Sequence, residues 1–327
     1  MRAAVLAADG PALVDRDPPQ PGPTEVAVRV AAAALNRADL LIAAGRRHGA
    51  QGGLGTPLGL EWCGTVIDAG ASVTTLRHGD RVMGSGGGGF AEIAVADERR
   101  CFALAGTALD DQQAAGLTIA LRTAYVALVV TGALRRGQSV MVLGASSSTG
   151  LMTMQVARVL GAGLVIGSST QALRRSRLAD FGAHHAVDTT DAHWAEQVLQ
   201  LTGGRGVDLL VDHLAGPLLN DAMRATAVGG CIVNVGRMAG ETAAFDCDLH
   251  SLRRIRYQGT TFRTRSADEV GAIGRDLRTA LWPALAAGRL RLPIDSRWPL
   301  ERVAEAYAHM RANRHFGKIL VLPPAAG

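Results

Sequence analysis

A strand, a turn of small residues and a helix follow one another in residues 138–162, and this unit constrains the fold more than any other stretch. QSVMVLG is a nearly continuous apolar run that ends at Gly144. Such a run is typical of a strand in a parallel sheet that is buried on both faces. The stretch LMTMQVARVLGA then has few helix breakers before Gly161 and Gly163. The sequence therefore predicts a strand–turn–helix unit of the kind that builds doubly wound sheets.

The alternation of strand and helix continues for at least four cycles. The expected strands are LVIGSS, AVD, VDLLVDH and CIVNVG, and the expected helices between them are ALRRSRLADFGA, residues 192–202 and PLLNDAMRATAVGG. Strands that alternate with helices favour an α/β fold with a doubly wound parallel sheet, which binds its ligand at the carboxyl ends of the strands.

The first hundred residues have a different pattern. Short apolar stretches such as GTVIDAG and DRVMG stand between frequent Gly, Asp and Pro turn signals, which indicates a β-rich, barrel-like unit. Two helices over 276–288 and 299–312 and a last strand, GKILVL, close the chain. Because 327 residues exceed one compact core, we expect two domains: residues 1–120 completed by 258–327, and residues 121–257.

Composition excludes several classes of function. The net charge of +5 comes almost entirely from scattered arginines, and aromatic residues make up only 4%, so nucleic-acid binding is not expected. The four cysteines form no C-x-x-C pair, which argues against a structural zinc site. No apolar run reaches the ~18 residues that a membrane span needs, and the first residues do not resemble a signal peptide. The sequence thus predicts a cytoplasmic protein with no membrane partner.

The turn after the first parallel strand reads GASSSTG. The positions of a G-x-G-x-x-G fingerprint are occupied by Ala145, Ser147 and Gly150, with Gly144 just upstream and Thr149 inside the motif. Small residues before a helix leave backbone N–H groups open to a pyrophosphate. These five residues are therefore candidate contacts to a dinucleotide.

The end of the second strand indicates which dinucleotide is preferred. A carboxylate usually holds the ribose 2′-hydroxyl of NAD there, but this stretch offers Ser168 and Ser169 as donors and has no acid until Asp180. Arg174 or Arg175 could pair with a 2′-phosphate. The pattern favours NADPH over NADH, although both arginines could instead be a solvated helix face.

Several stretches in this order resemble the medium-chain dehydrogenase/reductase superfamily, from Met1 to about Leu322. They are ALNRADLLIAAG, PLGLEWCGTVIDAG, HGDRVMG, GFAEIAVAD, RTAYVAL, QSVMVLGASSSTG, GVDLLVDHLAG and GKILVL. The resemblance implies a GroES-like β-rich catalytic domain beside a Rossmann domain for the cofactor.

Missing residues favour one branch of that superfamily. Zinc-dependent members carry a cysteine where Asn36 or a neighbour stands, a histidine where Leu60 stands, and a four-cysteine lobe where this chain reads SGGGGF. The resemblance therefore implies no metal, and the Asn-x-x-Asp form of Asn36 to Asp39 is similar to the zinc-free quinone oxidoreductases and enoyl reductases.

In that branch the nicotinamide gives a hydride to a quinone or to an activated alkene. The resemblance implies that Asn36 and Thr123 lie near the nicotinamide and that Gly236 offers its backbone there. Relatives often carry a tyrosine where this chain has Arg47, followed by His48. His48 is thus a candidate proton donor, or an exposed loop residue, and Arg47 and Asn36 are candidates for the substrate pocket.

Three functions remain open. The first is NADPH-dependent reduction of a quinone, the second is reduction of an enone or enoyl thioester, and the third is a dinucleotide-binding redox sensor with little turnover. The partner is a small molecule in the first two. The stretch RYQGTTF, residues 256–262, resembles the edge strand through which relatives pair, so we expect a homodimer.

Overall fold

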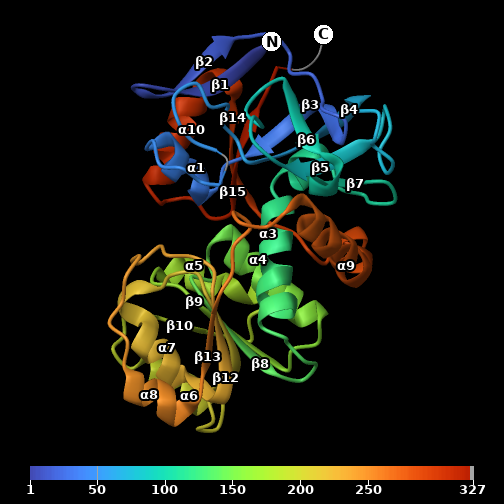
Figure 1. Ribbon diagram of the computed structural model, residues 1–327. Helices are drawn as coiled ribbons and strands as arrows, with labels where there is room; N and C mark the ends of the chain where they lie inside the picture. The colour runs from blue at the N-terminus through green and yellow to red at the C-terminus, as the bar shows by residue number, and fades with distance from the viewer. Residues whose placement is uncertain (50, 325–327) are drawn as a thin grey trace. The chain divides into compact units, whose positions relative to one another are not determined.

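The computed structural model describes residues 1–49 and 51–324. The chain forms two compact units (Figure 1). One consists of Met1–Ile119 together with Phe262–Gly327, and the other is the continuous segment Ala120–Thr261. Each unit has its own sheet and its own apolar core.

The continuous unit is built on a six-stranded sheet in which every pair of neighbours is parallel. The strand order is β10-β9-β8-β11-β12-β13. The bounds are β8 (Ser139–Leu143), β9 (Leu164–Ser168), β10 (His185–Val187), β11 (Val207–Asp212), β12 (Thr226–Asn234) and β13 (Arg256–Gly259). This sheet confirms the expected α/β class with a doubly wound parallel sheet.

The central strand β8 explains why this sheet is covered on both faces. All five of its residues are buried, so neither face of the strand meets water. The helical segments of this unit are α3 (Thr118–Tyr125), which begins just before the boundary, η2 (Val126–Thr131), α4 (Ser148–Val159), α5 (Ala172–Ser176), η3 (Leu178–Phe181), α6 (Trp194–Leu201), η4 (Gly216–Leu218), α7 (Leu219–Ala225) and α8 (Cys247–Arg253). Buried apolar side chains of α6 and α7 share one core with those of β8 and β11.

The strand order reverses beside β8. The chain runs from β8 outward to β9 and β10 on one side, and then returns to β11 on the other. In open parallel sheets the loops diverge at such a point and leave a crevice at the carboxyl ends of the strands. The ends of β8 and β11 are therefore where a ligand of this unit is expected.

The other unit carries a sheet of order β14-β15-β3-β4-β5-β7, joined by β6 through β3, and a separate β1–β2 pair. Its pairs are antiparallel except β14 and β15, which are parallel. The strands are β1 (Arg2–Ala7), β2 (Gly10–Asp15), β3 (Glu25–Ala34), β4 (Glu61–Ala69), β5 (Arg81–Ser85), β6 (Ile93–Asp97), β7 (Cys101–Ala103), β14 (Ile294–Pro299) and β15 (Lys318–Leu322). The helical segments are α1 (Arg37–Ala43), η1 (Glu98–Arg100), α2 (Asp111–Ala115), α9 (Ala267–Ala286), η5 (Leu300–Arg302) and α10 (Val303–Arg311). Trp62, Phe90 and Tyr307 are the largest side chains in its core.

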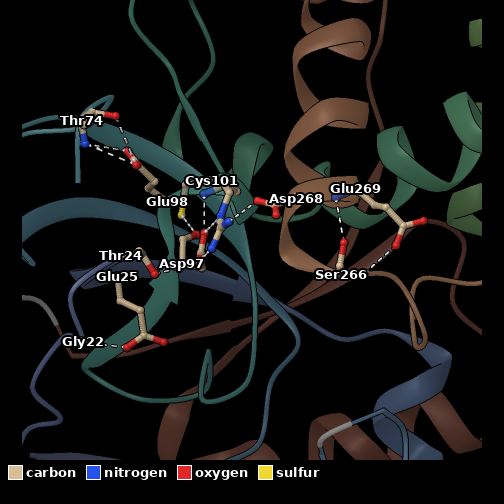
Figure 2. Close-up of polar contacts among 11 residues, drawn as sticks. Gly22, Thr24, Glu25, Thr74, Asp97, Glu98, Cys101, Ser266, Asp268 and Glu269 are labelled. Carbon is tan, nitrogen blue, oxygen red and sulfur yellow. Dashed lines mark hydrogen bonds and ion pairs between the residues drawn. The ribbon is translucent and has the colours of Figure 1, made fainter. Parts of the chain in front are cut away.

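Polar contacts attach the returning segment of the chain to this unit (Figure 2). Arg99 of η1 forms ion pairs with Asp97 and, over 2.6 Å, with Asp268 in the first turn of α9. Ser266 caps α9 by accepting from the backbone N–H of Glu269, whose carboxylate accepts from the N–H of Ser266. This reciprocal cap fixes where α9 begins.

The structure corrects two expected helices. Residues 226–230, expected to end a helix, instead begin β12, because Thr226 pairs with Val207 of β11 and Gly229 has a φ of +75° that a helix does not allow. The helix expected over 172–183 is divided into α5 and η3. No helix among the described residues is long and apolar enough to cross a membrane. The outer strand β13 is exposed along its length, and its pairing with a second copy stays a prediction.

Candidate functional site

The turn between β8 and α4 is closed by Ser147. Its Oγ accepts a hydrogen bond from the N–H of Gly150 at 3.1 Å and donates one to the carbonyl of Gly144 at 2.8 Å. Gly144 has a φ of +71°, which favours glycine. A Cβ on Gly150 would lie 2.6 Å from the Gly144 carbonyl oxygen, so no side chain fits there. The turn and the N-terminus of α4 have the geometry that binds an anion in dinucleotide-binding folds.

The end of β9 is joined to this turn by two serines. Ser168 Oγ accepts from the N–H of Gly144 at 3.0 Å, and Ser169 Oγ donates to Ser146 Oγ at 3.2 Å. Ala145 is buried between them, with its N–H on the carbonyl of Ser168. The structure therefore brings together the residues that the sequence proposed for the phosphates and the ribose.

The two adjacent arginines of α5 have different surroundings. Arg175 donates to Asp188 and to the carbonyl of Ser169, both over 2.8 Å. Asp188 also accepts from the backbone and side chain of Thr190, and these bonds, with Arg175, lower the pKa of its carboxyl group. Asp188 follows β10 rather than β9, so the linear sequence did not place an acid near Ser169. The charge of Asp188 is therefore balanced by Arg175, and the contact of either arginine with a 2′-phosphate stays a prediction.

His213 is a site residue that the sequence reading missed. It follows β11 directly and is 4% exposed. Burial lowers its pKa to about 4, so the imidazole is neutral near pH 7, and its Nε2 has no hydrogen-bond partner among the described residues. A Cβ on Gly144 would lie 3.3 Å from the Cβ of His213, which places the histidine beside the turn. The rule that ligands bind at strand ends could have identified it.

Gly236 lies against the same strand end. Its N–H donates to the carbonyl of Asp212 at 3.1 Å, and a Cβ there would collide with the carbonyl oxygen of His213. Thr123 lies on α3 and is partly buried. Its role beside the nicotinamide stays a prediction. The glycine turn, the N-terminus of α4 and the buried Nε2 of His213 together fit a dinucleotide phosphate and its neighbouring sugar.

Asn36 of the other unit belongs to a buried charged network. Its Nδ2 donates to Glu61 Oε1 at 3.0 Å, and its Oδ1 accepts from Lys318 Nζ at 2.9 Å. Lys318 Nζ also donates to Glu61 Oε1. Asn36 is the N-cap of α1, and its backbone N–H donates to Asp39 at 2.7 Å. Burial, and then the nearby Glu61, raise the pKa of Asp39 to about 7.

His48 and Arg47 lie in the loop after α1 and are not part of that network. The backbone of His48 is bonded to Gln51, and Gly49 lies against the backbone of Arg263. Burial and then Arg263 lower the pKa of His48. A lowered pKa leaves the imidazole mostly neutral near pH 7, which weakens the expectation that it donates a proton. Arg47 is exposed, and its place in a substrate pocket stays a prediction.

No group of three or more histidine, cysteine, aspartate or glutamate side chains is placed to hold a metal among the described residues. A hollow of about 290 Å³ does occur in the Rossmann unit. It is lined by Arg135, Asp208 and Arg256, which stand at the amino ends of the strands. It is therefore on the edge opposite the glycine turn and is not the dinucleotide site.

Two family models match the chain. The model of the alcohol dehydrogenase GroES-like domain matches residues 22–106, and that of the zinc-binding dehydrogenases matches residues 148–274. A mycocerosic acid synthase-like polyketide synthase of Mycobacterium tuberculosis is 31% identical over 97% of the chain. The chain spans only 15% of that synthase.

Other relatives have about the length of this chain. A quinone oxidoreductase-like protein 2 of Bos taurus is 29% identical over 95% of the chain and 89% of its own length. The structure of Escherichia coli quinone oxidoreductase complexed with NADPH superposes with a TM-score of 0.86 and covers 99% of this chain and 100% of that one. At 20% identity, this last likeness shows the fold.

The two units and their order define an oxidoreductase with a GroES-like domain and a dinucleotide-binding domain. The chain belongs to the medium-chain dehydrogenase/reductase superfamily.

Proposed function

We propose that this protein is a zinc-independent, NADPH-dependent reductase that transfers a hydride to a quinone or to an activated alkene. The observation that carries the proposal is the buried ammonium of Lys318 between Asn36 and Glu61. Asn36 stands where zinc-dependent relatives have a ligand, and a fixed cation at this position repels a divalent metal ion. A hydride acceptor that needs no Lewis acid suits such a site.

The Rossmann unit supports NADPH as the donor. Ser168 and Ser169 lie beside the glycine turn, Arg174 lies on the following helix, and the carboxylate of Asp188 is paired with Arg175. A 2′-phosphate would meet donors and a cation rather than an unpaired negative charge. The bound dinucleotide would supply the hydride, and the chain would orient it and exclude water.

Reduction of an enoyl thioester is the second candidate, and the similarity to polyketide synthases favours it. Such substrates carry phosphates on their carrier group, and Arg46 and Arg47 in the exposed loop after α1 offer positive charge. The two candidates share the hydride transfer and differ only in the acceptor.

The test is the consumption of NADPH by metal-free protein, followed in the near-UV, with a quinone, an enone and an enoyl thioester compared and NADH as the second donor. We expect turnover with NADPH that a metal chelator does not reduce. Arg174→Ala should raise KM for NADPH about tenfold, the size of one charge-assisted contact, and leave NADH unchanged. Arg177→Ala, in the same segment, is the matched control.

Tight NADPH binding without turnover on any acceptor would favour the sensor instead. Activity lost on chelation and restored by zinc would contradict the proposal.

A further inference from the structure

Lys318 is the only lysine in the chain, which has 34 lysines and arginines in total. It begins β15 and is 2% exposed. An ammonium is a compact point charge with three donors on a flexible stem, whereas a guanidinium is a wider planar fork. The single lysine is thus used at a buried position, beside Asn36 and Glu61, where arginine would need more room.

The packing around the lysine stem agrees with this. A Cβ on Gly116, at the end of α2, would lie 2.7 Å from Cγ of Lys318. Gly116 has a φ of −99°, which any residue can adopt, so glycine is needed there for space and not for its conformation. Gly116 therefore leaves room for the unbranched stem of Lys318.

The ammonium reaches a closed triangle of hydrogen bonds. Lys318 donates to Asn36 Oδ1 and to Glu61 Oε1, and Asn36 Nδ2 donates to the same Glu61 oxygen. The other oxygen, Glu61 Oε2, accepts from the backbone N–H of Ile119 at 2.9 Å. If the Asn36 amide were reversed, its oxygen would face the carboxylate and its NH₂ group would face the ammonium. Both contacts would be repulsive, so the two charges fix the orientation of the amide.

The triangle is buried at two corners and open at the third. Lys318 and Glu61 are buried, whereas Asn36 is only partly so. The second N–H of the Asn36 amide has a long contact, 3.4 Å, to the carbonyl of Ala34. Because Asn36 is partly exposed, this N–H is the donor that we expect a bound molecule to use, through a shorter hydrogen bond than the one to Ala34. A cation on Oδ1 draws electron density from the amide and makes its N–H a stronger donor.

We propose that Lys318 and Glu61 are positioning residues that hold and polarise the Asn36 amide, so that its second N–H stabilises the oxygen of the hydride acceptor. This inference rests on the proposed function. The acceptor gains a hydride from the dinucleotide, which leaves in its oxidised form, and negative charge develops on the acceptor oxygen. The Asn36 N–H donates to that oxygen, and a proton from solvent completes the reduction.

The kinetic test is a double-mutant cycle. Lys318→Met together with Glu61→Gln removes both charges, which avoids leaving one of them buried and unpaired. We expect this pair to lower kcat tenfold to a hundredfold and to change KM for NADPH less than threefold. Asn36→Ala should lower kcat by a similar factor, and the three changes together should do no more than Asn36→Ala alone. Independent effects that multiply would overturn the proposal, as would a wild-type kcat in the folded double variant.

A second measurement does not depend on turnover. Because the chain has one lysine, protein grown with lysine labelled at Nζ with nitrogen-15 has a single ammonium signal. We expect that signal to move on Asn36→Ala and on addition of a quinone to the NADP⁺ complex, which cannot transfer a hydride. Thr65→Ala, on the same strand as Glu61 but outside the triangle, is the control and should leave the signal in place.

The two ideas can fail separately. If the wild-type protein passes no hydride to any acceptor, the proposed function is wrong. If turnover occurs but the ammonium signal does not move on Asn36→Ala or on addition of the quinone, the positioning role of Lys318 is wrong.

Discussion

The two units bury polar groups at their candidate sites in opposite ways. In the GroES-like unit, the side chains of Asp39, Glu61 and Lys318 are buried, and Glu61 and Lys318 are bonded to each other and to Asn36. In the Rossmann unit, the turn at Gly144 is built from backbone groups and serine hydroxyls, and one neutral histidine, His213, is buried beside it.

This difference predicts what each unit tolerates. A site built from charges depends on the protonation and the pairing of its members. A site built from backbone depends on the space that glycine leaves, and it responds to any added atom. The following three changes test this contrast.

The largest expected effect concerns the pH dependence of the GroES-like unit. Asp39 has its pKa raised to about 7, so the folded protein holds a proton that the unfolded chain releases near pH 4. The contribution of Asp39 to the free energy of unfolding is therefore fully present below the pKa of the unfolded chain. It is lost as the pH rises through about 7, by about 4 kcal/mol in all. Asp39→Asn keeps an acceptor for the Asn36 N–H and should remove this loss. Urea unfolding at a series of pH values measures it, with exposed Asp68→Asn as control.

An unfolding free energy that falls equally with pH in wild type and in Asp39→Asn would show that Asp39 is ionised throughout. The contrast between the units would then lose its main support.

The second effect has the opposite sign and belongs to the Rossmann unit. Burial lowers the pKa of His213 to about 4, so the unfolded chain takes up a proton first as the pH falls below about 6.5. Stability from this group is present above that pH and is lost on acidification towards pH 4, by about 3 kcal/mol. His213→Gln should flatten the acid limb of the same unfolding series, whereas exposed His185→Gln should not. An unchanged acid limb would mean that His213 is hydrated.

The smallest effect on stability tests the dependence on volume. A methyl group at Gly150 would lie 2.6 Å from the Gly144 carbonyl and 2.7 Å from Cα of Ala145. We expect Gly150→Ala to cost about 1–3 kcal/mol in unfolding free energy and to weaken NADPH binding at least tenfold. Titration calorimetry measures the binding. Gly259→Ala, where nothing lies within 4 Å of the new methyl group, should change neither. Unchanged binding in Gly150→Ala would show that the turn can move aside.

Much of the candidate site could be predicted because the relevant signals are local. The turn from Gly144 to Gly150 could be predicted from its small residues, which stand between an apolar strand and a helix. The family resemblance indicated Asn36 as a site residue, and where Asn36 lies relative to an acceptor stays a prediction. The partners of Asn36 could not be predicted, because Glu61 and Lys318 are 25 and 282 residues away along the chain.

The sequence by itself determined the α/β class, the superfamily and the strand–turn–helix that a dinucleotide would use. Periodicity and small-residue turns act over a few residues, so they can be read along the chain. The tertiary structure alone decided that Arg175 is held by Asp188 and that the single lysine lies against Asn36 and Glu61. It also decided that the buried Nε2 of His213 has no hydrogen-bond partner in the described part of the chain. Charge pairing and burial depend on distances in space, and only the folded sheets bring these distant residues together.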